Sequence, residues 1–112
     1  MKPKKIYNKK RGPEKIIQIA IVKKLRLLGW FVKETHGNLY QSGFPDLYAC
    51  HKEYGPRWVE VKNPKKYRFT PAQLRDFPLF TANGADIWVL VSDSDYEINK
   101  LFKSANWYQY LK

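Results

Sequence analysis

An apolar stripe at helical spacing is the first regular pattern along the chain. Its members lie three or four residues apart, as on one buried face of an α-helix. They are Ile17, Ile21, Leu25 and Leu28. Because proline suits the first position of a helix and glycine its C-terminal cap, we expect this helix to begin at Pro13 and to stop at Gly29.

Strand patterns fill the next part of the chain. A first strand is predicted to begin at Trp30–Val32. Two more are predicted over residues 46–51 and 57–62, and a turn near Glu53 joins them. Both of these later segments carry apolar residues on both faces, so we expect them to lie inside a sheet.

A second helix and a fourth strand follow. The run Thr70–Gln73 fits a capping box with proline at the first helical position, and Asn83–Gly84 should end the helix. Pro78 is expected to kink or split it. Ile87–Val91 gives the clearest strand pattern of the chain.

The C-terminal region is less regular. Ser92–Asp95 predicts the start of a short helix that runs to Lys103, and the aromatic tail Trp107–Tyr110 is ambiguous. The order helix, three strands, helix, strand predicts an α/β fold with a mixed central sheet flanked by helices. A helix that connects the third and fourth strands makes that pair parallel.

Composition places the chain among small folded domains. With 112 residues, 44% hydrophobic and 16% aromatic, it is long enough for one core and too apolar for a disordered chain. A single cysteine, Cys50, excludes an internal disulfide or a Cys-rich zinc site and indicates a reducing compartment. No apolar run approaches the roughly 20 residues that cross a membrane, and the basic start lacks the features of a signal peptide.

The net charge of the chain indicates the class of its binding partner. Lys and Arg total 21 against 10 acids, a formal net charge of +11, which favours a polyanionic partner such as nucleic acid. Residues 1–11 contain no acid and are typical of a flexible basic arm or of a solvated tail, so the domain spans 12–112. Phosphate contacts are predicted for Lys9, Lys10, Arg11, Lys65, Lys66 and Arg68.

Charged side chains in the two inner strands suggest a metal-binding or catalytic site. Glu60 and Lys62 are two residues apart, so both project from one face of their strand, about 7 Å apart at the backbone. If the hairpin turn centres on Glu53, Asp46 lies opposite Glu60, with Cβ atoms about 5 Å apart. Two such carboxylates repel each other unless a cation lies between them.

A hard divalent cation suits these oxygen ligands. Mg²⁺ or Mn²⁺ could bind between Asp46 and Glu60, with the main-chain carbonyl of Val61 as a further ligand. A water activated by that ion could attack phosphorus, with Lys62 assisting the nucleophile. Glu14, on the stripe of the first helix, would face the same site.

Each of these residues also has a purely structural explanation. Asp46 follows a proline and could be a turn residue at the start of a strand. Glu60 and Lys62 could form a surface pair on an edge strand, and Glu14 could simply favour the positive end of the helix dipole. Gln73 is fully explained as the capping partner of Thr70.

Several other polar and aromatic residues carry weaker signals. His36 and His51 lack partners at ligand spacing, and no role is assigned to them. Tyr40, Tyr67 and Phe69 could stack on bases, although buried packing is favoured.

Taken together, the motifs resemble those of a known family. Glu14, the run Gly43–Asp46, the run Glu60–Lys62 and Gln73 resemble the PD-(D/E)XK nuclease superfamily, and more specifically a small stand-alone VRR-NUC domain of the phage and bacterial type. The resemblance runs from about residue 12 to residue 92. It implies a restriction-endonuclease-like α-β-β-β-α-β core, in agreement with the order of elements above.

The resemblance also implies an activity. It implies Mg²⁺- or Mn²⁺-dependent endonucleolytic hydrolysis of DNA, with metal ligation by Asp46 and Glu60, a water-mediated metal contact by Glu14, Lys62 as the catalytic lysine and an active-site role for Gln73. Such domains are similar to Holliday-junction resolvases, and some act as homodimers on four-way or other branched DNA. A bacterial or phage-infected host cytosol is the corresponding location.

Two rival hypotheses remain. In the first, the chain is a non-catalytic nucleic-acid-binding module whose basic surface functions and whose acids are structural. In the second, it is a restriction-type or nicking endonuclease that reads base sequence, although 112 residues leave little room for a recognition element.

Overall fold

The computed structural model describes residues 12–35 and 42–111, and its elements follow the predicted order. The helices and strands are α1 (Gly12–Leu27), β1 (Phe31–Glu34), β2 (Leu47–His51), β3 (Gly55–Val61), α2 (Pro71–Ala82), β4 (Ile87–Leu90) and α3 (Asp95–Ile98). Two 3₁₀ helices, η2 (Asn99–Phe102) and η3 (Trp107–Tyr110), complete the C-terminal region. The predicted basic arm lies outside the described residues.

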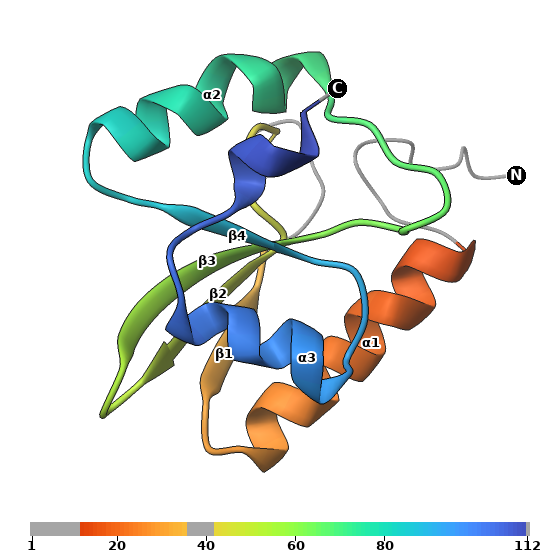
Figure 1. The fold of residues 1–112 in the computed structure, drawn as a ribbon, viewed down its shortest axis with the longest axis vertical. Helices are drawn as coiled ribbons and strands as arrows, with labels where there is room; N and C mark the ends of the chain where they lie inside the picture. The colour runs from red at the N-terminus through yellow and green to blue at the C-terminus, as the bar shows by residue number, and fades with distance from the viewer. Residues whose placement is uncertain (1–11, 36–41, 112) are drawn as a thin grey trace, which may run out of the picture.

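A mixed sheet of four strands forms the centre of the molecule, in the order β1-β2-β3-β4 (Figure 1). β2 pairs antiparallel with β1 and with β3, whereas β3 and β4 are parallel. The interior position of β2 and β3 and the parallel pair are therefore confirmed. Because β3 and β4 run in the same direction, their carboxyl ends lie at one end of the sheet.

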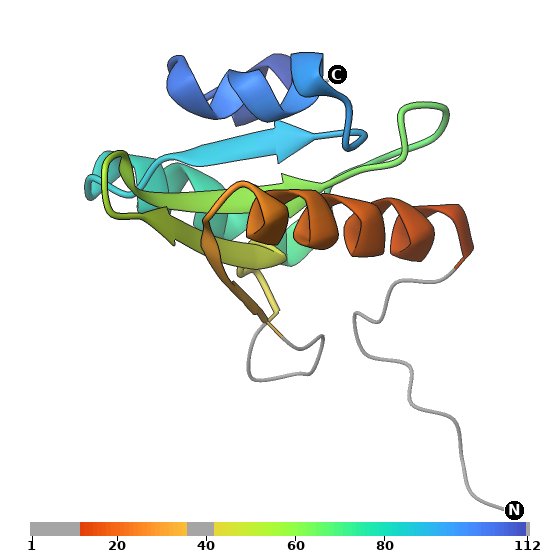
Figure 2. The same cartoon turned by 90° about the horizontal axis from the view of Figure 1, so that it is seen from below.

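Helices cover the two faces of the sheet and create two separate cores (Figure 2). On one face, α1, α3 and η2 pack on strand residues such as Leu47, Val59 and Leu90. On the other face, α2 and η3 contribute Phe77 and Trp107 to a smaller aromatic core. Alternation along each strand directs successive side chains to opposite faces, which separates the two cores.

The prediction for Leu28 is wrong, and so is one of the two alternatives for Pro78. Leu28 is 49% exposed, because α1 ends at Leu27 and the chain already turns at Gly29, whose φ is +94°. Buried Val22 continues the core face instead. Pro78 does not split α2, which is unbroken from Pro71 to Ala82.

The N-terminus of α2 has the predicted capping box. The Thr70 hydroxyl accepts the Gln73 N–H, and the Gln73 side chain accepts the Thr70 N–H. Among the described residues, no helix has the length and apolar character required to cross a lipid bilayer.

Candidate active site

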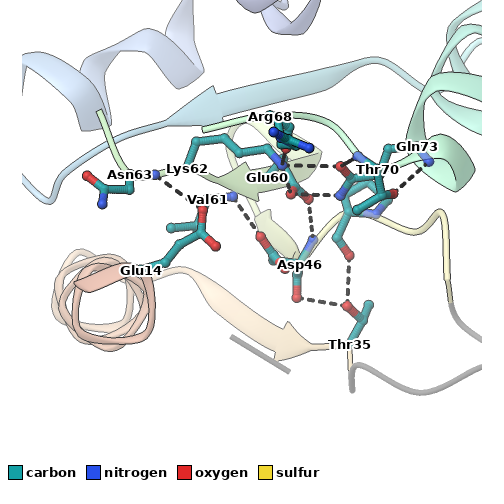
Figure 3. Close-up of polar contacts among 11 residues, drawn as sticks. Glu14, Thr35, Asp46, Glu60, Val61, Lys62, Asn63, Arg68, Thr70 and Gln73 are labelled. Atoms are coloured by element: carbon teal, nitrogen blue, oxygen red, sulfur yellow. Dashed lines mark hydrogen bonds and ion pairs between the residues drawn. The ribbon is translucent and has the colours of Figure 1, made fainter. Parts of the chain in front are cut away.

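The hairpin register brings two acids together at the start of β2 and the end of β3. Leu47 pairs with Val59, so the next position places Asp46 opposite Glu60, as the position of the turn predicts. The Asp46 N–H donates to Glu60 Oε1 at 3.2 Å, and Asp46 Oδ2 accepts the Val61 N–H at 2.8 Å (Figure 3). The Asp46 side chain thus extends the pairing of β2 with β3 by one residue before the start of β2.

Glu60 and Lys62 are buried, which excludes a surface pair on an edge strand. Glu60 is 0% and Lys62 3% exposed, and Lys62 Nζ lies 3.2 Å from Glu60 Oε2. The ammonium also donates to the Arg68 carbonyl at 2.9 Å and lies 4.7 Å from the centre of the Phe69 ring. A buried charge is costly unless it is paired and hydrogen-bonded, and this pair meets both conditions.

Gln73 joins the cap of α2 to the two charges. Its Nε2 donates to Glu60 Oε2 at 2.8 Å, while its Oε1 accepts from Lys62 Nζ at 3.2 Å. The same Oε1 accepts the Thr70 N–H at 3.0 Å. The sequence analysis gives capping and an active-site role as alternatives for Gln73. In the structure its side-chain amide does both, since it caps α2 and contacts Glu60 and Lys62.

Thr35, directly after β1, is a contributor that the sequence reasoning missed. Its hydroxyl donates to the carbonyls of Pro45 and Asp46 at 2.8 and 3.0 Å, and its N–H donates to the Asp46 carbonyl at 2.9 Å. Thr35 therefore fixes the backbone from which the Asp46 carboxylate projects. An isolated threonine at a strand end gives no sequence signal for this role.

Glu14 reaches the same end of β3 from α1, but through a different contact. Its Oε2 accepts the Asn63 N–H at 3.2 Å, one residue beyond Lys62 (Figure 3). Within residues 12–35 and 42–111, no group of three or more His, Cys, Asp or Glu side chains is arranged to hold a metal ion. Of the three predicted acids, Asp46 and Glu60 lie opposite each other across the hairpin, and Glu14 contacts the backbone just beyond the C-terminal end of β3, at Asn63.

Comparison with known proteins gives one informative match. No protein-family model matches the chain, and no curated protein does. A solved structure described as a "VRR_NUC domain" matches with a TM-score of 0.65 and 27% sequence identity, covering 82% of this chain and 96% of that one. The fold is that of a VRR-NUC domain. The resemblance carried by the sequence motifs is confirmed.

In this VRR-NUC fold the segment of residues 63–70, between β3 and α2, follows the site directly, and we call it the basic loop. Asn63 organises its first turn, since its Oδ1 accepts the Lys65 N–H at 3.0 Å and its carbonyl accepts the Lys66 N–H at 3.2 Å. Lys65, Lys66 and Arg68 are exposed. Lys9, Lys10 and Arg11 fall outside the described residues.

The remaining candidates have structural surroundings. His51 accepts the Glu53 N–H at 3.0 Å and packs on Trp30, at the hairpin end of the VRR-NUC sheet. Phe69 is buried against Phe77, whereas Tyr67 is only half-buried. His36 and Tyr40 lie outside the described residues.

Proposed function

We propose that this VRR-NUC domain is a nuclease that hydrolyses phosphodiester bonds in DNA with the help of Mg²⁺ or Mn²⁺. The observation that supports it best is the pairing of Asp46 with Glu60 beside the buried ammonium of Lys62. A purely structural buried ion pair would not need a second carboxylate on the neighbouring strand.

The donor set of the site suits a hard divalent cation. Magnesium is usually bound by one or two protein carboxylates and retains several waters, so it does not require three acids. Asp46 and Glu60 would hold it, and each carboxylate oxygen can accept more than one interaction. The Val61 carbonyl points to the same side of β3 as its N–H, which faces Asp46, and is the third ligand we propose.

The bound cation would supply Lewis-acid stabilisation of charge on the phosphate and a nucleophile at neutral pH. Lys62 places a positive charge beside Glu60, and this charge can stabilise negative charge on an attacking oxygen or on a phosphate oxygen. Gln73 keeps the Glu60 carboxylate in place, and Thr35 does the same for the backbone of Asp46. Glu14 acts more remotely, through Asn63 or a bound water.

Charge supports DNA as the substrate. The net charge is +11, and the exposed Lys65, Lys66 and Arg68 follow the site within a few residues. Cationic side chains bind phosphates without regard to sequence, so they would hold the backbone while the acids act on one bond.

Branched DNA, such as a four-way junction, is the substrate structure that we propose. Resolving such a junction needs two cuts, and one chain offers one site, so a homodimer is part of the proposal. Sedimentation of the protein alone and with junction DNA tests it, with a two-chain species expected. A monomer under both conditions would contradict the dimer without affecting the nuclease assignment.

Cleavage assays test the activity. Four-way, flap, duplex and single-stranded DNA are incubated with Mg²⁺, with Mn²⁺ or with a chelator. We expect metal-dependent cleavage that Asp46→Asn and Glu60→Gln abolish while DNA binding persists. Glu53→Gln, the same change on the exposed hairpin, is the matched control and should cleave normally.

The same assays identify the rival function. A non-catalytic binding module would cut none of the substrates with either ion. Its DNA affinity would still fall steeply with salt, as phosphate contacts require. That pair of results would replace the nuclease assignment with the binding module.

A further inference from the structure

The C-terminal 3₁₀ helix returns to the basic loop and completes a row of tyrosines there. The rings of Tyr67, in the loop, and Tyr110, in η3, meet edge to face with centroids 5.7 Å apart. The Lys100 ammonium lies over the ring of Tyr110 and also over the ring of Tyr96, at the start of α3. We call Tyr67, Tyr110 and Tyr96 the tyrosine row.

Lys100 fixes the geometry of this row. Its ammonium donates to Tyr110 Oη at 2.9 Å and lies 5.5 and 5.6 Å from the ring centres of Tyr110 and Tyr96. It also pairs with Glu97 Oε2 at 2.7 Å. Burial lowers the pKa of Lys100, but its hydrogen bonds to Glu97 and Tyr110 outweigh that effect and raise it above its ordinary value. The cation therefore stays charged and holds two of the rings in place.

The tyrosine row is continuous with the candidate active site. Lys62 Nζ donates to the carbonyl of Arg68, and the Phe69 ring lies against the same ammonium. Tyr67 comes one residue before Arg68, so the basic loop connects Lys62 to the row. Exposed cations and aromatic residues thus follow one another along this stretch of chain.

Two acidic residues beside Tyr96 are paired with lysines. Asp95 pairs with Lys24 of α1 at 2.9 Å, and Glu97 pairs with Lys100. Tyr96 itself is 72% exposed. Its ring is held on one side by Lys100 and is otherwise largely open to solvent.

We propose that the tyrosine row binds unstacked bases of a single-stranded DNA segment that leaves the active site, while Lys65, Lys66 and Arg68 hold its phosphates. Aromatic rings interleaved with cations are the usual platform for single strands, because every base has a π face that can stack. Paired bases inside a duplex cannot reach such rings. The inference rests on the proposed function only in taking DNA as the partner.

A binding assay without divalent cations tests this role separately from cleavage. Fluorescence anisotropy measures the affinity of the full chain for an oligothymidylate of about ten nucleotides, a common site size for such platforms. Tyr96→Ala should weaken binding about tenfold, the loss typical of one stacked base. Tyr96→Phe, which keeps the ring, should restore it.

Two controls separate stacking from charge and from folding. An abasic oligonucleotide of the same length should bind Tyr96→Ala and the parent chain equally, because it offers phosphates but no bases. Tyr54→Ala removes a tyrosine at the hairpin end, 44% exposed, and should leave oligothymidylate binding unchanged. Thermal melts confirm that each variant is folded.

The outcomes distinguish this inference from the nuclease proposal. Equal affinity of Tyr96→Ala and the parent chain for oligothymidylate overturns the tyrosine row, whether or not the protein cuts DNA. An equal loss on the abasic strand also overturns it, because the effect is then not stacking. A tenfold, base-dependent loss in a protein that never cleaves supports the row and removes the nuclease assignment.

Discussion

At the scale of single residues, the charge balance of the site depends on Lys62. Replacing it by methionine keeps most of the volume but leaves the Glu60 carboxylate buried without its cation. Removing one partner of a buried pair typically costs about 3–5 kcal/mol. We expect Lys62→Met to lower the free energy of unfolding by about that amount in urea titrations, and Lys52→Met on the exposed hairpin to leave it nearly unchanged.

A second substitution tests the cause of that loss. If the cost comes from an uncompensated carboxylate, adding Glu60→Gln to Lys62→Met should recover part of the stability, because the amide is neutral. A glutamine keeps only one acceptor oxygen, so it can serve either the Asp46 N–H or the Gln73 amide but not both, and the recovery should therefore be incomplete. Purely additive losses in the double variant would contradict this account and indicate a packing defect.

Gly43 gives another prediction at this scale. Its φ is +92°, and a Cβ there would collide with the Asp76 carboxylate of α2. Gly84 has φ +93° but open space around it, so it is a matched control. Gly84→Ala should cost about 1–2 kcal/mol for backbone strain alone. Gly43→Ala should cost more and should also reduce cleavage, since it displaces the segment that leads to Asp46.

Thermal melts of both glycine variants measure the difference. Equal losses for the two would show that the contact with Asp76 relaxes without cost. The expected excess at Gly43 would show instead that α2 holds the loop before Asp46 in position.

Sequence reasoning reached some site residues because they depend on local rules. The turn position fixes the hairpin register, so Asp46 opposite Glu60 follows from counting residues. The contacts of Thr35 and Asn63 could not be predicted in the same way. Thr35 contacts two main-chain carbonyls. Asn63 contacts Glu14, 49 residues away in the sequence, through its main-chain N–H. Because both contacts involve main-chain atoms, the side-chain types in the sequence do not reveal them.

At the scale of elements, α2 tolerates a proline in its interior. Pro78 cannot donate to the carbonyl four residues earlier, yet the helix continues to Ala82. Its capping box and its packing through Phe77 evidently outweigh the loss. Pro78→Ala should therefore stabilise the domain, by roughly 1–3 kcal/mol.

Pro71 provides the comparison. At the first helical position the missing N–H has no helical partner to lose, so Pro71→Ala should give no comparable gain. Denaturant titrations of both variants measure the contrast. A gain of similar size at both positions would mean that the effect arises in the unfolded chain rather than in α2.

The elements themselves were largely predictable, because their signals are periodic or local. The helix crossing between β3 and β4 was sufficient to predict their parallel pairing. Two details failed for different reasons. Leu28 continues the apolar spacing but lies where the chain leaves the helix, and α2 continues through Pro78 because tertiary packing outweighs the helix-breaking tendency of proline.

At the scale of the whole molecule, the two ends of the sheet differ in character. The hairpin end carries an aromatic cluster around Trp30 and Tyr54. The opposite end carries Glu60, Lys62 and the basic loop. Parallel pairing of β3 and β4 explains this division, because it brings the carboxyl ends of both strands to one place.

Under the proposed function, this polarity should make DNA affinity depend on particular cations rather than on net charge alone. Each phosphate contact that is lost should reduce the slope of log affinity against log salt by about 0.9 for duplex DNA. Lys66→Ala should therefore lower the slope by about 0.9, and the triple change of Lys65, Lys66 and Arg68 to alanine by roughly 2–3. Lys52→Ala removes the same charge at the hairpin end and should leave the slope unchanged, as measured by anisotropy titrations over a range of salt concentrations. Equal reductions from Lys66 and Lys52 would mean that the +11 charge acts as a diffuse field, and the basic loop would then have no special place in DNA binding.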